Sequence, residues 1–206
     1  MEARSKSKLL IVEGNDEVHV VEKLVKRHQL RQSFDIWEKG GFTELRKSIY
    51  NEVNVSQREA LGILADANSS CKKRWQSISE KLREADCEVP ANLAHAGSVF
   101  SGPRGIRVGV WLMPDNKRPG ELEDFVAKLI PQNDPLWPRA QAYIDGIPAE
   151  ERKFESRKLT RAHVHAWLAA RKSPRRMGTA ITAGDLRHDA PVATSLVGWL
   201  RELFGA

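Results

Sequence analysis

Acidic side chains directly follow two apolar runs, and they are the residues of this chain with the clearest potential for chemistry. Glu13 comes immediately after the run "LLIV", and Asp66 ends the run "ALGILAD", with Asn68 two residues further on. The carboxyl ends of parallel strands form the edge of an open α/β sheet where ligands bind. If both runs are parallel strands, Glu13 and Asp66 lie at one edge of one sheet.

The spacing of Asp66 and Asn68 suits a divalent cation. Mg²⁺ prefers oxygen ligands, usually one or two carboxylates, with water and substrate phosphate completing the coordination sphere. Asp66 fits that role, and Asn68 offers a carbonyl oxygen without a charge. The alternative is an Asx-type turn, in which Asn68, Ser69 and Ser70 lead into the next helix. The spacing alone leaves both interpretations open.

A third acidic group occurs in the stretch "GELED" at residues 120–124. On a helical wheel, Glu121 and Glu123 flank the apolar stripe of the expected helix, and either could turn toward the site. Asp124 lies opposite the stripe, so we expect it to point to water. The alternative is that these residues only complement the dipole of a helix in its first turn.

The elements that must position these side chains follow from the apolar pattern. Continuous apolar runs predict strands over 9–12, 60–66 and 106–113, with a weaker candidate over 34–39, and such runs are typical of parallel strands covered on both faces. Helical spacing predicts helices after residue 15, over 42–53, around 75–85 and over 122–130. The alternating order predicts an α/β fold with a central parallel sheet of about four strands flanked by helices.

The sequence pattern changes beyond about residue 131. Four prolines interrupt residues 131–148, and further helices are expected near 159–171 and 194–204. We therefore expect an α/β domain over 1–130 and a mainly helical extension over 131–206. These helices are too few and too short for an independent core, so the extension should pack on the domain.

Basic residues concentrate in the extension. The chain of 206 residues has a net charge of +6, which fits a polyanionic partner. The candidates for contacting the phosphate backbone of a nucleic acid are Arg152, Lys153, Arg157, Lys158, Arg161, Arg171, Lys172, Arg175 and Arg176. The alternative is a solvated helix face.

Other classes of protein are less compatible with the sequence. Cys71 and Cys87 lack the spacing of a thiolate metal site. No apolar run approaches the roughly 20 residues of a membrane span, and "LLIV" is too short for the core of a signal peptide. We expect a cytoplasmic protein with no membrane association.

The motifs together resemble the Toprim domain, which occurs in topoisomerases, DnaG-type primases and small nucleases. The resemblance rests on "VEG" at 12–14 with Glu17 after it, and on "LGILADAN" at 61–68. The segment "GELED" is similar to the Asp-Leu-Glu element of the overcoming-lysogenisation-defect nucleases. The sequence of the whole chain resembles a stand-alone bacterial Toprim-like family of uncharacterised function.

The resemblance implies a Toprim-like, Rossmann-like fold and Mg²⁺- or Mn²⁺-dependent processing of phosphodiester bonds, most simply by a nuclease. Glu13 would then be the general acid/base or a metal-linked carboxylate, Asp66 a metal ligand, and Glu121 or Glu123 the completion of the cluster. The chain departs from the pattern at Asn68, where the second aspartate of Asp-x-Asp is expected. It also departs more mildly at Glu17, which replaces the usual aspartate.

Two other functions are compatible with these residues. The first is a Toprim-derived module that binds nucleic acid or protein with weak or no catalysis, which Asn68 favours. The second is a small-molecule phosphatase in which Asp66 accepts the phosphoryl group, although the chain lacks the second acidic residue expected there. Candidate partners are nucleic acid, a second copy of the chain and a protein partner in a defence-type system. The sequence does not distinguish DNA from RNA.

Overall fold

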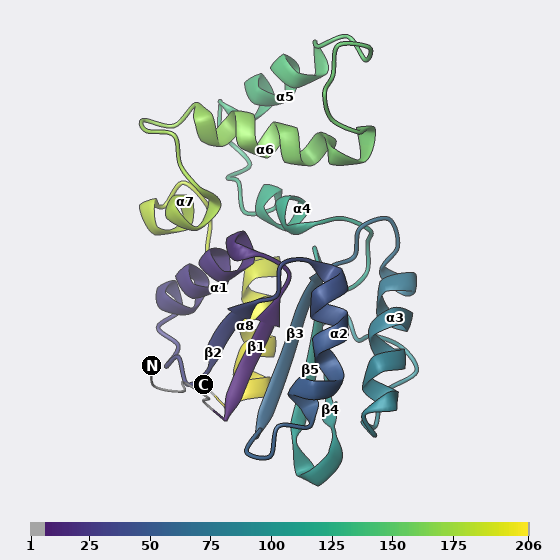
Figure 1. Cartoon of the computed structure of the whole chain (residues 1–206). Helices are drawn as coiled ribbons and strands as arrows, with labels where there is room; N and C mark the ends of the chain where they lie inside the picture. Colours follow the sequence, from purple (N-terminus) through teal and green to yellow (C-terminus); the bar gives the residue numbers. More distant parts are fainter. Residues whose placement is uncertain (1–6, 206) are drawn as a thin grey trace.

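A five-stranded sheet forms the centre of the fold in the computed structural model, which describes residues 7–205. Its strands are β1 (Lys8–Val12), β2 (Asp35–Glu38), β3 (Ala60–Asp66), β4 (Ser98–Ser101) and β5 (Arg107–Met113). The spatial order is β2-β1-β3-β5-β4 (Figure 1). The first four of these are parallel, and β4 runs antiparallel to β5.

Four helices cover the two faces of the sheet. Their bounds are α1 (Asn15–Arg27), α2 (Phe42–Val53), α3 (Cys71–Glu84) and α8 (Pro191–Phe204). Helices α1 and α8 share one core with Leu10 and Val12 of β1, whereas α2 and α3 share the other core with Leu9 and Ile11. Successive strand residues point to opposite faces, so a continuous apolar run supplies both cores at once.

Helix α8 approaches the sheet closely because two strand positions lack side chains. Gly62 of β3 and Gly109 of β5 are direct partners in the parallel register. A Cβ atom added at Gly109 would lie 2.7 Å from Leu203 Cδ2 of α8, well inside van der Waals contact. The aromatic ring of Phe204 also stacks on that of Phe34, with ring centroids 4.1 Å apart. The end of the chain is thus part of the central core.

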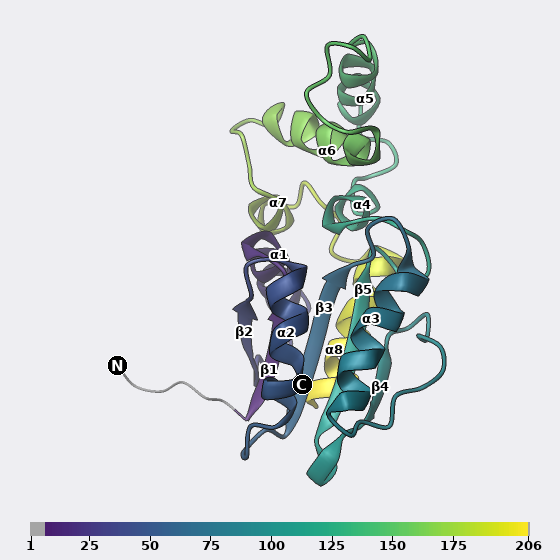
Figure 2. The ribbon, with the colours of Figure 1, turned by 45° about the vertical axis from the view of Figure 1, so that its right-hand side comes forward.

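The remaining helices lie at or beyond the carboxyl edge of the sheet. They are α4 (Leu122–Ala127), α5 (Trp137–Asp145), α6 (Leu159–Ala169) and α7 (Met177–Ala183), with short 3₁₀ turns η1 (Pro103–Gly105) and η2 (Ser156–Lys158). Helix α4 sits next to the strand ends, α7 packs on α1, and the α5–α6 pair projects furthest from the sheet (Figures 1 and 2). Within residues 7–205, no helix combines the length and apolar character needed to cross a membrane.

The predicted α/β class, the mostly parallel sheet and the helical C-terminal region are confirmed. Strand β4 was not predicted, because a four-residue edge strand with serine at both ends carries no apolar run. Helices α5 and α7 were also missed. Helix α8 begins at Pro191, earlier than the predicted 194, because proline is favoured in the first turn of a helix.

Candidate acidic site at the carboxyl edge of the sheet

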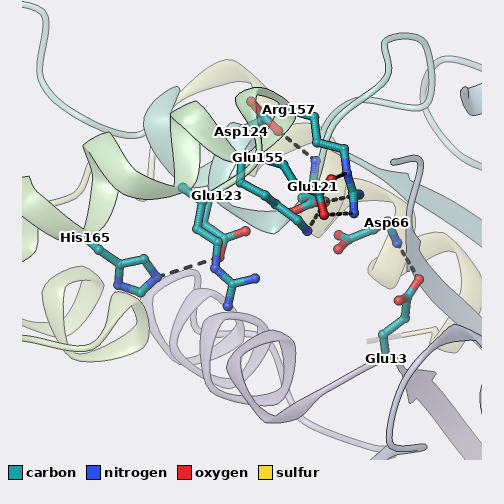
Figure 3. A network of polar contacts seen from close by, with 10 residues as sticks. Glu13, Asp66, Glu121, Glu123, Asp124, Glu155, Arg157 and His165 are labelled. Carbon is teal, nitrogen blue, oxygen red and sulfur yellow. Dashed lines mark hydrogen bonds and ion pairs between the residues drawn. The ribbon is translucent and has the colours of Figure 1, made fainter. Parts of the chain in front are cut away.

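Glu13 and Asp66 meet at the point where the strand order reverses. Strand β1 has β2 on one side and β3 on the other, so the crevice between the ends of β1 and β3 is a topological switch point. Glu13 follows β1, Asp66 ends β3, and Glu13 Oε1 accepts a hydrogen bond of 2.9 Å from the backbone N–H of Asp66 (Figure 3). The structure therefore brings together the two residues on which the predicted site is centred.

The start of α1 adds a further carboxylate to this crevice. Gly14 is the N-cap residue, and its backbone N–H donates to Glu17 Oε2 over 3.1 Å, as in a capping box. Glu17 is only 7% exposed. Together with Asp66, Glu123 and Arg161, it lines a cavity of about 190 Å³. Glu17 is thus a residue of the site as well as a cap.

Helix α4 brings Glu121 and Glu123 to the same place. Glu121 is its N-cap residue, and both glutamates are buried, at 7% and 5% exposed. Gly120 exchanges two backbone hydrogen bonds with Asn68, of 2.7 and 2.8 Å, which ties the start of α4 to the end of β3. The expectation that Asp124 points to water is wrong. Its carboxylate accepts a hydrogen bond of 2.8 Å from the backbone N–H of Glu121 and caps the helix.

Asn68 has a structural role that the spacing alone did not indicate. Its φ of 50° lies in the left-handed region, which asparagine tolerates better than most residues. When its amide is oriented to satisfy both neighbours, its NH₂ group donates to Glu121 Oε1 over 2.9 Å and its oxygen accepts from the Arg74 guanidinium. An aspartate at this position would place a second negative charge against Glu121.

Cations from η2 and α6 pair with the acidic residues of α4. The Lys158 ammonium donates to Glu121 Oε1, and Arg157 lies 3.8 Å from the same oxygen. Arg161 Nε is 3.1 Å from Glu123 Oε1, and His165 Nε2 is 3.7 Å from it (Figure 3). The two groups of opposite charge predicted from the sequence therefore contact each other.

The basic segment divides into three groups. Arg157, Lys158 and Arg161 reach the acidic site. Three others are engaged within the α5–α7 region: Arg152 donates to the carbonyl oxygens of Asp145 and Ile147, Arg171 pairs with Asp134 at 2.9 Å, and Arg175 pairs with Asp185 at 2.9 Å. Lys153, Lys172 and Arg176 are exposed. The nine predicted nucleic-acid contacts therefore do not form one uniform surface of free cations.

Burial and mutual repulsion raise the pKa values of the central carboxyl groups. Burial, followed by the charges of Glu13, Glu17, Glu121 and Glu123, raises the pKa of Asp66 to about 9. The pKa of Glu17 rises to about 7 for the same reasons. Burial also raises the pKa of Glu13, despite its hydrogen bond from the Asp66 backbone. In contrast, His165 and Arg161 outweigh burial at Glu123 and lower its pKa.

One oxygen of the site has no partner. Asp66 Oδ1 is buried and accepts no hydrogen bond from any described residue. Buried polar atoms are nearly always satisfied, so an exception needs an explanation such as an unseen ion or a catalytic role. However, residues 7–205 contain no group of at least three His, Cys, Asp or Glu side chains that is arranged to hold a metal ion. The acidic side chains of α4 are instead turned toward protein cations.

Sequence reasoning did not assign Glu17, His165 and Arg74 to the acidic site, and it assigned Arg161 to nucleic acid instead. Glu17 had a signal, because it lies three residues after a glycine N-cap and matches the last position of a capping box. Arg161 and His165 are four residues apart and thus share a helix face, which indicates a common partner. Arg74 had no such signal, since only the packing of α3 beside β3 brings it to Asn68.

A family model for a protein of unknown function (DUF3226) matches residues 7–205 of the chain. The chain belongs to this family. The match spans the segments that form the sheet, the α5–α6 pair and α8 of this chain. Neither the search of curated proteins nor that of solved structures gave a match.

Proposed function

We propose that this chain is a Mg²⁺- or Mn²⁺-dependent phosphodiester-processing enzyme, most simply a nuclease, with a Toprim-like domain. The observation that carries the proposal is Asp66 at the switch point of a parallel sheet, whose Oδ1 is buried and accepts no hydrogen bond from any described residue. Burial and the charges of four further carboxylates, from Glu13, Glu17, Glu121 and Glu123, raise its pKa. A divalent cation is the ligand that such a cluster of oxygens would favour most.

The residues fit a metal ion in their chemistry. Asp66 and Glu13 would hold it, because both are oxygen donors at the ends of neighbouring strands and burial raises the pKa of each. Glu121 and Glu123 would join them on release from Lys158 and Arg161. When bound, the metal would neutralise phosphate charge and supply a nucleophilic water.

The remaining steps belong to residues of the chain. Glu13, whose pKa is raised by burial, would accept or return a proton at its carboxylate. Lys158 and Arg161 form ion pairs with Glu121 and Glu123 in this structure. They would exchange these partners for the phosphates of a bound strand. Arg74, held against the ring of Phe42 at 3.4 Å, would keep Asn68 and thereby Glu121 in place.

A second function, that of a binding module with little catalysis, is favoured by a different observation. The carboxylates of Glu121 and Glu123 already contact cations of the same chain, and Asn68 donates to Glu121 where an aspartate would complete the metal set. Calorimetric titration with Mg²⁺ and Mn²⁺ separates the two functions. Absence of metal binding, with and without nucleic acid, would support the binding module.

The test of the enzymatic proposal is a cleavage assay. Plasmid, single-stranded DNA and RNA are incubated with the purified chain and Mg²⁺, Mn²⁺ or chelator. We expect metal-dependent cleavage of at least one substrate, lost in Glu13→Gln and in Asp66→Asn. Glu44→Gln, a change of an exposed carboxylate on α2, is the matched control and should cleave normally. Cleavage at the wild-type rate by either site variant would refute the assignment.

A further inference from the structure

A second cavity lies at the same edge of the sheet, beyond the end of β5. Its volume is about 390 Å³, larger than that of the acidic crevice. The lining includes Trp111 of β5, Arg118 of the following turn, Lys128 at the end of α4, and Pro191, Val192 and Ser195 of α8. This volume falls within the range of small-ligand sites, which combine an apolar wall with a few polar groups.

The cavity offers hydrogen-bond donors rather than acceptors. Trp111 is 1% exposed, and its Nε1 is a buried donor without a partner among the described residues. Helix α8 begins at Pro191 with no side-chain cap, so the N–H groups of its first turn also lack that partner. An acceptor atom of a ligand could satisfy the Trp111 indole N–H, for which no described residue supplies an acceptor.

The charge of the cavity also favours an anion. Its one carboxylate, Asp115, is already saturated: it accepts from Lys128 Nζ at 2.6 Å, from Arg118 Nε at 2.8 Å and from two backbone N–H groups. Two cations against one carboxylate leave a net positive charge beside the apolar wall of Trp111, Pro191 and Val192.

We propose that this cavity binds a nucleoside monophosphate group, with the base against the apolar wall and the phosphate beside Arg118 and Lys128. The group could belong to a free nucleotide or to the phosphorylated end of a nucleic acid strand. Helix α4 relates the two sites, because Glu121 is its N-cap and Lys128 its C-cap. Seven residues at about 1.5 Å each separate them by roughly 10 Å. The binding itself does not depend on the proposed nuclease activity.

The test uses the full chain in chelator, so that failure of the metal site cannot affect the result. Calorimetry compares a nucleoside monophosphate with the nucleoside and with ribose 5-phosphate, and we expect the intact nucleotide to bind at least tenfold more tightly than either part. Ser195→Trp, which fills the cavity, and Lys128→Ala should each weaken binding at least tenfold. Thr194→Trp and Lys117→Ala, changes at adjacent positions outside the lining, are the matched controls.

Nuclear magnetic resonance of the tryptophan side chains gives an independent readout. The indole N–H of Trp111, assigned with Trp111→Phe, should shift when nucleotide is added, because it gains an acceptor. The indoles of Trp167 and Trp199 should not shift, since they already donate to Asp134 at 3.1 Å and to the Ser98 carbonyl at 3.2 Å. An oligonucleotide with a 5′-phosphate is then added as a competitor of the bound nucleoside monophosphate. Displacement of the nucleotide would identify the end of a strand as the ligand, and no displacement would identify the free nucleotide as the ligand. No binding of nucleotide, or binding unaffected by Ser195→Trp, would overturn the proposal.

Discussion

The ends of β3 and β5 are neighbouring regions of one sheet edge, but the aspartates at these two ends have opposite surroundings. Asp115, two residues beyond β5, accepts hydrogen bonds from Lys128, Arg118 and two backbone N–H groups, and these partners hold its pKa below the usual range despite partial burial. Asp66, at the end of β3, has an unpartnered oxygen and a pKa raised to about 9.

This difference separates structural carboxylates from candidate catalytic ones. A saturated carboxylate stabilises the fold and has little capacity left for a ligand. A carboxyl group that is buried without compensation destabilises the fold, and such groups persist mainly where function needs them. Asp66 belongs to the second kind, so its chemistry should respond to substitution, to pH and to metal, whereas Asp115 should respond only through stability.

The largest expected effect is on catalysis. Asp66→Asn keeps the size of the side chain but removes the charge that would hold a metal, and we expect cleavage to fall by about 10³-fold or more. Single-turnover cleavage at saturating enzyme measures this, while circular dichroism shows that the variant is folded. A variant that is folded and retains more than about a tenth of the wild-type rate would place the metal elsewhere.

The second expected effect is on the pH dependence of stability. The folded-state pKa of Asp66, about 9, exceeds its ordinary value of 3.8, so the native state holds the proton more tightly than the unfolded state. The contribution of Asp66 to the free energy of unfolding is therefore greatest below about pH 4, and it falls as the pH rises toward 9. Asp66→Asn removes this loss, and we expect it to be about 2–4 kcal/mol more stable than wild type near pH 9.

Asp115→Asn supplies the contrast for the same measurement. The pKa of Asp115 is lowered, so its contribution is present above its ordinary value of 3.8 and is lost as pH falls. We expect this variant to lose about 1–2 kcal/mol at neutral pH, because two charge-assisted hydrogen bonds weaken. Urea denaturation of both variants across the pH range tests the comparison. If both shift stability in the same direction near pH 9, the contrast between the two strand ends is wrong.

A smaller effect is expected from metal binding on the stability of the wild-type chain. A metal at 100 times its dissociation constant adds about 2.7 kcal/mol to the free energy of unfolding when only the native state binds. Thermal denaturation with Mg²⁺ or Mn²⁺ against chelator should therefore show stabilisation of the wild type and none of Asp66→Asn. Equal stabilisation of the two would mean that the metal binds at another site.

The smallest effect is expected at Asn68. In Asn68→Asp the new carboxylate faces Glu121, and the donor that Glu121 receives at 2.9 Å is lost. We expect a loss of about 1–2 kcal/mol in chelator, and tighter metal binding because a charged oxygen joins the site. Asn68→Gly is the control, because it keeps the left-handed backbone and removes the amide. A stabilised Asn68→Asp variant in chelator would contradict the bridge to Glu121.

The sequence predicted the elements of the sheet better than the surroundings of the site. The runs 9–12, 60–66 and 106–113 are continuously apolar because each strand serves two cores, and that pattern is local. Strand β4 and helices α5 and α7 were missed because they are short, and their placement depends on neighbours distant in the chain. The sequence left Asn68 open between a metal ligand and an Asx-type turn, and the structure adds its left-handed backbone and its bridge between Glu121 and Arg74.

By itself, the sequence determined that carboxylates stand at the ends of two strands of an α/β sheet, because residue type and apolar length are local properties. Only the tertiary structure decided that β1 and β3 are neighbours, that η2 and α6 turn cations onto Glu121 and Glu123, and that Asp66 Oδ1 accepts no hydrogen bond from any described residue. The pKa of a carboxyl group depends on burial and on charges within a few ångströms. Some of those neighbours come from segments more than 50 residues away, as Glu13 and Glu121 do for Asp66.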